Sequence, residues 1–340
     1  MIGHYVHHHG SGHLHRAMTI APHLPEPVTG LSSLPRPDGW QGDWVQLPRD
    51  DSDPVGYATA DVTAGERLRW VPLQDDGLRE RTHALSSWIE RERPSAMLVD
   101  QSVEVTLTAR LHGVPVVGFT APGHRGDPAH TLGFDVCSAL VGAWPEGCTD
   151  AMLPGVPERI RRRFTAVGGC SRFPVALPEH RPGPGRRAGR HVVVIAGDGG
   201  DSFSAPALER ARASTPDWTW TVLSRRLGTW HPDPAALLAT ADVAVIHAGQ
   251  NSVAEVASLR VPAVVVPQPR PFDEQVTTAT VLSEGWPALV LDTLPDVGWS
   301  DVLEQAASLD GDAWQSWCDG RSAERVAALV RAVIHERRAA

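Results

Sequence analysis

The chain has 340 residues, of which 42% are hydrophobic and 21% are charged, and its formal net charge is −9. This length and composition predict a globular protein of two domains, and the acidic balance argues against a general nucleic-acid-binding protein. Because the chain contains no lysine, a Walker-type phosphate loop, a lysine Schiff base and a pyridoxal phosphate anchor are all excluded.

Cysteine spacing and hydropathy indicate where the protein works. The cysteines at 137, 148, 170 and 318 form no CxxC pair, which argues against a zinc site and a disulfide framework and favours a reducing cytoplasm. The N-terminus has no signal-peptide pattern, and no run of about 18 apolar residues predicts a membrane span. Arginines 161–163 leave peripheral contact with the inner face of the membrane open, although a short basic run is more often a solvated helix face.

Short apolar runs alternate with helix-like stretches in the N-terminal half of the chain. We expect strands at 2–7, 96–100 and 114–119, and helices at 13–21, 82–91 and 103–111. This repeated βαβ order predicts an α/β fold with a parallel sheet.

A segment dense in proline, glycine and arginine, PVALPEHRPGPGRRAGR at 174–190, predicts an interdomain linker. We therefore expect an N-terminal domain over 1–178, a linker over 179–190 and a C-terminal domain over 191–313. The tail from Trp314 to Arg338 reads as a helix, and the segment 314–340 could pack back across the domain junction.

The C-terminal half contains a strand that ends in a turn of small residues. The strand at 243–246 is followed by HAGQNS, and a helix is expected to start near Ser252, so backbone amides would point beyond the strand's carboxyl end. In open α/β sheets, ligands bind in the crevice beyond the carboxyl ends of the strands. The positive end of a helix at this position would attract an anion such as pyrophosphate. Asn251, the one asparagine of the chain, suggests that the turn requires a short amide.

An alternative without a ligand stays open at this turn. Ser252 and Glu255 have the S-x-x-E spacing of a capping box, which would satisfy the amides at the helix start. The polar run Asp273-Glu274-Gln275 after the next strand favours a convergent ligand site instead.

The pattern HxGxNSxxE over 247–255, followed by VP, a buried strand and D-E-Q, resembles the nucleotide-sugar signature of GT-B fold glycosyltransferases. The most similar group contains the bacterial transferase that makes lipid II together with related natural-product and plant enzymes. The resemblance implies two Rossmann-like domains whose parallel sheets face a central cleft.

The resemblance also implies a donor site. His247 and the turn would hold the donor pyrophosphate, Glu255 would bond the ribose hydroxyls, Glu274 and Gln275 would bond the sugar with Asp273 beside them, and Arg172 would face the phosphates. The turn consists of Gly249, Gln250, Asn251 and Ser252, and the glycine-rich loop after the first strand of the donor domain is identified as Gly197, Gly199 and Gly200. Arg260 replaces a usual glycine and Thr277-Thr278 a common asparagine, so the identity of the sugar is open.

The opening sequence MIGHYVHHHGSGHLHR allows three interpretations. An affinity tag is disfavoured because the stretch supplies the first expected strand and helix. A metal site could use His7 with His9, or His9 with His13, but no acidic or cysteine ligand lies nearby in the sequence. As an enzyme loop, HHHGSGH resembles the family's first glycine-rich loop, which ends in a histidine.

The loop interpretation assigns a catalytic pair. Transfer to a hydroxyl needs a base, and histidine, with an ordinary pKa of about 6.5, can accept a proton near neutral pH, so His13 is the candidate base. Asp100 follows a strand and resembles the aspartate that orients this histidine in plant and natural-product transferases. The alternative is that Asp100 caps the helix after it.

The loop APGHRGDPAH at 121–130 offers four candidate acceptor contacts, His124, Arg125, Asp127 and His130, although each could be part of an ordinary solvated loop. Where the lipid II enzyme has an HEQN-like segment this chain has GFTAP, which predicts a different acceptor. The DSD stretch at 51–53 resembles the metal-binding DxD of another transferase fold but reads as a loop. The resemblance implies no obligatory metal or cofactor.

These observations together predict a hexosyltransferase-type glycosyltransferase. It would move a sugar from a nucleotide sugar, UDP-linked, to a small-molecule or lipid-linked hydroxyl acceptor with inversion at the anomeric carbon. Two alternatives stay open at this point: a non-hydrolysing nucleotide-sugar epimerase, and a catalytically silent sugar-nucleotide-binding partner protein.

Overall fold

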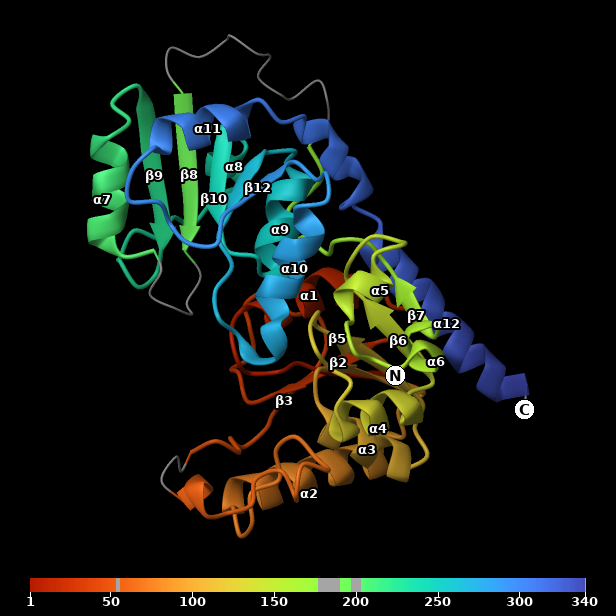
Figure 1. Cartoon of the computed structure of the whole chain (residues 1–340). Helices are drawn as coiled ribbons and strands as arrows, with labels where there is room; N and C mark the ends of the chain where they lie inside the picture. The colour runs from red at the N-terminus through yellow and green to blue at the C-terminus, as the bar shows by residue number, and fades with distance from the viewer. Residues whose placement is uncertain (53–55, 177–189, 197–202, 340) are drawn as a thin grey trace. The chain divides into compact units, whose positions relative to one another are not determined.

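The computed structural model describes residues 1–52, 56–176, 190–196 and 203–339 (Figure 1). The chain divides into two compact units: unit 1 consists of Met1–Val167 with Ala323–Ala340, and unit 2 of Gly168–Ser322. Within the described ranges, no helix combines the length and apolarity that crossing a bilayer requires.

Unit 1 contains a seven-stranded parallel sheet in the order β3-β2-β1-β4-β5-β6-β7. Its strands are β1 Ile2–Tyr5, β2 Val28–Ser32, β3 Trp44–Gln46, β4 Ala96–Asp100, β5 Val116–Thr120, β6 Ala139–Gly142 and β7 Phe164–Ala166. Its helices are α1 Gly12–Ile20, η1 Ala21–His23, η2 Gly56–Ala58, α2 Asp76–Glu92, α3 Val103–Leu111, α4 Pro128–Val136, α5 Thr149–Met152, α6 Glu158–Arg161 and α12 Ser322–Ala339.

Unit 2 contains a five-stranded parallel sheet in the order β12-β11-β10-β8-β9. Its strands are β8 Arg190–Ala196, β9 Trp218–Ser224, β10 Val243–Ile246, β11 Ala263–Val265 and β12 Ala288–Val290. Its helices are α7 Ala205–Ala213, α8 Pro234–Leu238, α9 Gln250–Ser258, η4 Pro271–Asp273, α10 Glu274–Leu282, α11 Trp299–Ala307 and η5 Gly311–Ser316. Two parallel sheets confirm the α/β prediction.

The central strands of both sheets are fully buried, as expected for parallel strands with both faces covered. Every residue of β10 is 0% exposed, and in unit 1 Ile2, Met97 and Leu98 are also 0% exposed. Because β1 pairs with β4 from Ile2↔Ala96 to Tyr5↔Val99, the loop after β1 and the last residue of β4 meet at one sheet edge. This edge carries the candidate catalytic residues.

Several expected boundaries differ in the structure for local reasons. The helix expected at 82–91 begins at Asp76 because Asp75 caps it, its carboxylate accepting from Leu78 N at 2.6 Å. The segment from Gly168 belongs to unit 2, where Gly169 N donates to Trp317 O at 2.7 Å. Of the expected linker at 179–190, only Arg190 lies among the described residues, and it begins β8.

The single helix expected over 314–338 is wrong. A 3-10 helix ends at Ser316, Gly320 adopts a left-handed φ of 81°, and α12 starts at Ser322. The left-handed backbone of Gly320 interrupts any continuous helix. From Ala323 the chain groups with unit 1, where the Arg325 guanidinium donates to Val167 O at 3.0 Å.

Candidate functional site

In unit 2 the expected donor turn lies directly after β10. The helix α9 begins at Gln250 with Gly249 as its N-cap and no side-chain cap. Ser252 therefore lies inside the first turn and does not cap the helix, so the capping-box alternative is wrong. Gln250, Asn251 and Ser252 supply the first backbone amides of α9, at the end of the helix whose dipole attracts anions.

The Glu255 side chain pairs with an arginine and does not cap the helix start. Its carboxylate accepts a hydrogen bond from Arg172 Nε at 2.8 Å, and its side chain is 6% exposed. Burial raises the pKa of Glu255, while the adjacent Arg172 guanidinium acts in the opposite direction. The structure thus brings together two of the residues that the sequence assigned to the donor site.

His247 is a buried neutral histidine. Its ring stacks on Phe203 with centroids 3.9 Å apart, and Nδ1 lies 3.0 Å from the Val266 carbonyl. Since a carbonyl can only accept, Nδ1 carries the proton and Nε2 keeps a lone pair. Burial lowers the pKa of His247 to about 4, so in the free protein this side chain is not a cation at neutral pH.

Gln275, of the second expected polar run, lies beside the same turn. The Gln275 side-chain oxygen accepts a hydrogen bond from Gln268 N at 2.9 Å. The Gln275 side chain also lies close to Gly249, since a Cβ atom on Gly249 would be 3.9 Å from Gln275 Nε2. Phe272 and Asp273 both have left-handed φ values, 63° and 54°, which non-glycine residues rarely adopt. Glu274 is the first residue of α10. The glycines at 197, 199 and 200 lie outside the described residues.

In unit 1 the candidate catalytic pair meets at the carboxyl end of β4. His13, the second residue of α1, places Nδ1 3.1 Å from Asp100 Oδ2. The carboxylate is 1% exposed. The helix after β4 is capped by Ser102, whose side chain accepts from Val105 N, so the alternative that Asp100 caps α3 is wrong.

Arg16 is a third member of this cluster that the sequence analysis missed. It binds Asp100 through Nη2, 2.8 Å from Oδ1, and through Nε, 3.1 Å from Oδ2, and the same Nη2 lies 3.1 Å from His13 Nδ1. Burial alone would raise the pKa of Asp100, but Arg16 and His13 outweigh it and hold that pKa well below its usual range. Asp100 is therefore an ionised, paired carboxylate.

The loop after β5 is more buried than a solvated loop would be. Arg125 is 4% exposed and His130 9% exposed, whereas His124 is exposed. Asp127 caps α4 by accepting from His130 N. Arg125 Nη1 lies 3.0 Å from His130 Nε2, which must accept, so Nδ1–H faces the Asp127 carboxylate. Burial, together with the Arg125 charge, lowers the pKa of His130 to about 4.

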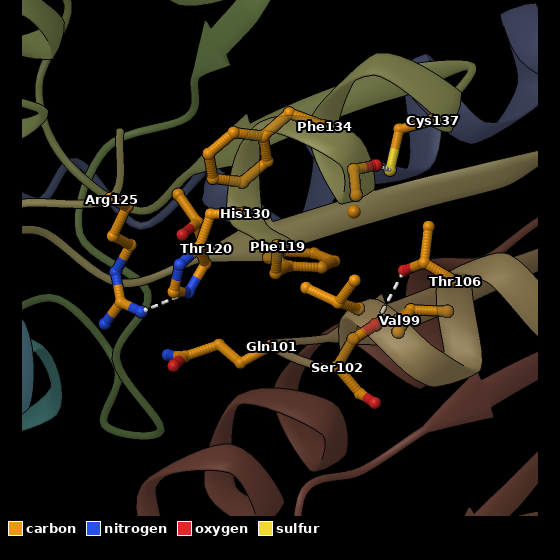
Figure 2. A pocket seen from close by; sticks show the side chains of 13 residues that line it. Val99, Gln101, Ser102, Thr106, Phe119, Thr120, Arg125, His130, Phe134 and Cys137 are labelled. Carbon is orange, nitrogen blue, oxygen red and sulfur yellow. Dashed lines mark hydrogen bonds between the residues drawn. The ribbon is translucent and has the colours of Figure 1, made fainter. Parts of the chain in front are cut away.

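Arg125 and His130 line a small pocket of about 30 Å³ at the carboxyl ends of β4 and β5 (Figure 2). Phe119, Phe134 and Val103 give it apolar walls, and Gln101, which directly follows Asp100, lies at its rim with a left-handed φ of 57°. His124 and Asp127 are not among the lining residues. The pocket therefore contains two of the four candidate acceptor residues.

The opening histidines are part of the fold. The strand β1 is paired on both sides, with β2 and β4, so the affinity-tag interpretation is wrong. The histidines that come together with a carboxylate are His8 and His9, which lie near Asp51. Asp51 lies in a loop, as expected, and Asp53 lies outside the described residues.

A family model, the glycosyltransferase family 28 C-terminal domain, matches residues 220–292. The matched range includes the turn after β10, α9, β11 and the start of α10, and thus the expected donor residues from His247 to Gln275.

One curated relative is the UDP-N-acetylglucosamine–N-acetylmuramyl-(pentapeptide) pyrophosphoryl-undecaprenol N-acetylglucosamine transferase of Shewanella piezotolerans. It is 25% identical over 247 residues, which cover 66% of this chain and 64% of the relative. The match therefore spans just under two thirds of the length of that relative.

Two solved structures resemble the whole chain. The glycosyltransferase of kitacinnamycin superposes with a TM-score of 0.65 at 19% identity and covers 98% of both chains. MurG of Acinetobacter baumannii superposes with a TM-score of 0.62 at 17% identity, covering 97% of this chain and 99% of that one. Neither the epimerase nor the silent-partner alternative finds support here. The chain has the GT-B fold, and its residues 220–292 match the glycosyltransferase family 28 C-terminal domain.

Proposed function

We propose that the protein is a hexosyltransferase-type glycosyltransferase that transfers a sugar from a UDP-linked donor to a hydroxyl acceptor with inversion. The observation that carries this proposal is the contact of His13 Nδ1 with the buried carboxylate of Asp100, 3.1 Å away. Arg16 Nη2, which lies 3.1 Å from the same Nδ1, already donates to both carboxylate oxygens of Asp100, so we assign a proton to Nδ1 and a hydrogen bond from it to Asp100. This tautomer leaves Nε2 of His13 as the basic nitrogen, which is the arrangement a general base requires.

The reaction is a single displacement. His13 Nε2 takes the proton of the acceptor hydroxyl while the hydroxyl oxygen forms a bond to the anomeric carbon. The bond from that carbon to the diphosphate oxygen breaks, and the diphosphate leaves with the electron pair. Attack opposite the leaving group inverts the anomeric configuration. Asp100 is a positioning residue that stabilises the protonated imidazole.

The donor half of the reaction is assigned to unit 2. The first amides of α9 and the Arg172 guanidinium are suited to hold the diphosphate as negative charge develops on it. Donor chemistry with UDP is supported by the name of the Shewanella piezotolerans relative, which contains UDP-N-acetylglucosamine. The Gln275 side chain next to Gly249 is suited to bond the sugar.

The acceptor is assigned to the pocket in unit 1. Its walls are largely apolar, with Arg125 and His130 at one side (Figure 2). A pocket of about 30 Å³ admits only a small group, and its walls suit an apolar end of a hydroxyl-bearing acceptor better than a purely polar sugar. Both a small molecule and a lipid-linked acceptor have this chemistry.

The first experiment measures thermal stabilisation of the protein by UDP, dTDP, GDP and ADP, because a ligand that binds the folded state raises stability by RT ln(1 + [L]/Kd). A selective shift with UDP that is lost in Glu255→Ala is expected. The exposed Glu304→Ala in α11 is the matched control and should keep the shift. No shift with any diphosphate at millimolar concentration would refute the proposed donor site.

A further inference from the structure

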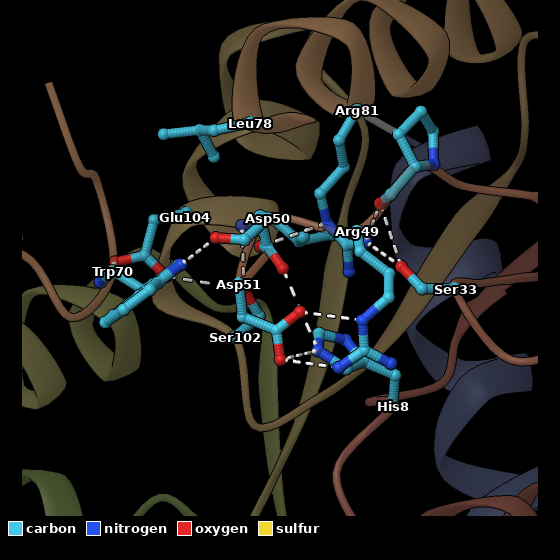
Figure 3. A network of polar contacts seen from close by, with 12 residues as sticks. His8, Ser33, Arg49, Asp50, Asp51, Trp70, Leu78, Arg81, Ser102 and Glu104 are labelled. Carbon is cyan, nitrogen blue, oxygen red and sulfur yellow. Dashed lines mark hydrogen bonds and ion pairs between the residues drawn. The ribbon is translucent and has the colours of Figure 1, made fainter. Parts of the chain in front are cut away.

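Two stretches that the proposed transfer reaction does not use come together in unit 1. His8 and His9 follow β1, and Asp51 lies beyond β3, while the sheet order β3-β2-β1 places the ends of these strands along one edge. His8 Nε2 and His9 Nε2 each lie 3.3 Å from Asp51 Oδ2. Figure 3 shows the His8 ring and the Asp51 carboxylate facing each other.

The two separations between Asp51 Oδ2 and the histidine nitrogens are those expected of ligands around a small metal ion. Zinc binds histidine nitrogen and carboxylate oxygen at about 2.0–2.2 Å in tetrahedral geometry, which places neighbouring ligand atoms roughly 3.3–3.5 Å apart. Both measured separations of 3.3 Å agree with this value, and all three ligand atoms lie within 4.8 Å of one another.

The burial of the cluster is a second observation that points to a binding site. The His8 side chain is 4% exposed, and the nearby carboxylate of Asp50 is 13% exposed with Oδ1 3.8 Å from His8 Nε2. Among the described residues, Asp50 Oδ1 finds no hydrogen-bond partner. A buried carboxylate oxygen without a donor is costly, and a cation beside His8 would offset that cost.

We propose that His8, His9 and Asp51 form a binding site for a divalent transition-metal ion of the zinc class. Two imidazoles and one carboxylate make a donor set typical of zinc, with a fourth position left for water or for Asp50. Two of the three ligands, His8 and His9, lie in the loop between β1 and α1, so a bound ion would fix the segment that leads into His13. The inference is independent of the transfer reaction and assigns no catalytic step to the metal.

Arg49 is the group with which a metal would compete. Its Nη2 lies 2.6 Å from Asp51 Oδ2, the same oxygen that contacts both histidines, while its Nε lies 2.9 Å from Oδ1. The Arg49 side chain is 52% exposed, so Nη2 can leave Oδ2 for solvent while Nε stays on Oδ1. Removal of this arginine should therefore tighten metal binding.

The test is a Zn²⁺ titration of protein without an affinity tag, after removal of metal with a chelator. One tightly bound Zn²⁺ per chain is expected in the wild type. Asp51→Asn keeps every histidine and should weaken binding at least tenfold, whereas Asp38→Asn, at an exposed position, should not change it. A histidine-rich surface that binds zinc adventitiously does not need Asp51, so equal affinity in Asp51→Asn would overturn the proposal.

Two further variants guard against misfolding. His9 is 62% exposed, so His9→Ala should fold normally, as judged by circular dichroism, and still lose at least tenfold in Zn²⁺ affinity. His23→Ala, an exposed histidine in η1, is its matched control and should bind as the wild type does. Arg49→Ala should bind several-fold more tightly, and unchanged or weaker binding there would contradict the assignment of Asp51 Oδ2 as a ligand.

Discussion

Arg16 binds both carboxylate oxygens of Asp100 through Nη2, at 2.8 Å from Oδ1 and 2.9 Å from Oδ2, and both side chains are almost completely buried. A buried carboxylate without its partner is strongly destabilising, by about 3–5 kcal/mol. We therefore expect Arg16→Gln to lower the stability of unit 1 by that amount, measured as the shift of its urea unfolding transition.

Two variants make this prediction specific. Arg16→Gln combined with Asp100→Asn removes the unpaired charge and should recover a large part of the loss. Arg79→Gln removes an exposed partner of Asp76 in α2 and should cost less than about 1 kcal/mol. If the double variant were no more stable than Arg16→Gln alone, the charge of Asp100 would not be the cause.

His13 and Asp100 are expected to act on turnover and not on donor binding. General base catalysis contributes about 10²- to 10⁴-fold, so His13→Ala should lower kcat within this range while the Kd for UDP stays unchanged. Asp100→Asn should lower kcat as well, since Asp100 is the group next to Nδ1 of His13. Measured rates of UDP release with a saturating acceptor test this, and full turnover in both variants would refute the catalytic pair.

The elements that could be predicted from the sequence were those with local signals. The strand at 96–100 and the helix at 103–111 occur with the expected bounds, because an apolar run precedes a Ser102 cap and a well-patterned helix. The start of α2 was missed by six residues because the Asp75 cap lies before the apolar positions that indicated the helix. The interruption at Gly320 depends on one left-handed residue in a sequence that otherwise reads as helical.

The site residues could be predicted where they lie close together in one segment of the sequence. Arg16 lies three residues after His13 and thus on the same face of α1, a signal that could have identified it. By contrast, the approach of Asp51 to His8 and His9 joins segments separated by more than 40 residues, and only the strand order β3-β2-β1 brings them together. The roles of the donor and acceptor residues stay predictions.

Removal of Arg172 should have an effect that depends on pH. Burial already raises the pKa of Glu255, and loss of the arginine, which acts against burial, raises it further. A carboxyl group with a raised folded-state pKa contributes stability below its unfolded value, and that stability is lost as pH rises through the folded value. Arg172→Met should therefore be more destabilising at pH 8 than at pH 5, by about 1.4 kcal/mol for each unit of additional pKa difference.

Thermal unfolding of Arg172→Met and wild type at both pH values measures this difference. Arg210→Met, which removes an exposed partner of Asp296 in the same unit, serves as the control and should show no such dependence. An equal loss at pH 5 and pH 8 would mean that Glu255 remains charged without Arg172, contrary to its burial.

His4 should make unit 1 sensitive to acid. It lies in β1, stacked on Phe119, and burial lowers the pKa of His4 to about 4. The unfolded chain binds a proton near pH 6.5 and the folded chain only near pH 4, so stability is present above pH 6.5 and is lost as pH falls. Between pH 7.5 and pH 5, protonation of this histidine in the unfolded chain alone should lower the free energy of unfolding by about 2 kcal/mol.

In His4→Phe that part of the acid sensitivity should disappear, whereas His112→Phe, at an exposed position, should retain it. Urea unfolding at the two pH values decides the matter, since identical pH dependence in wild type and His4→Phe would show that His4 is not the neutral buried group responsible.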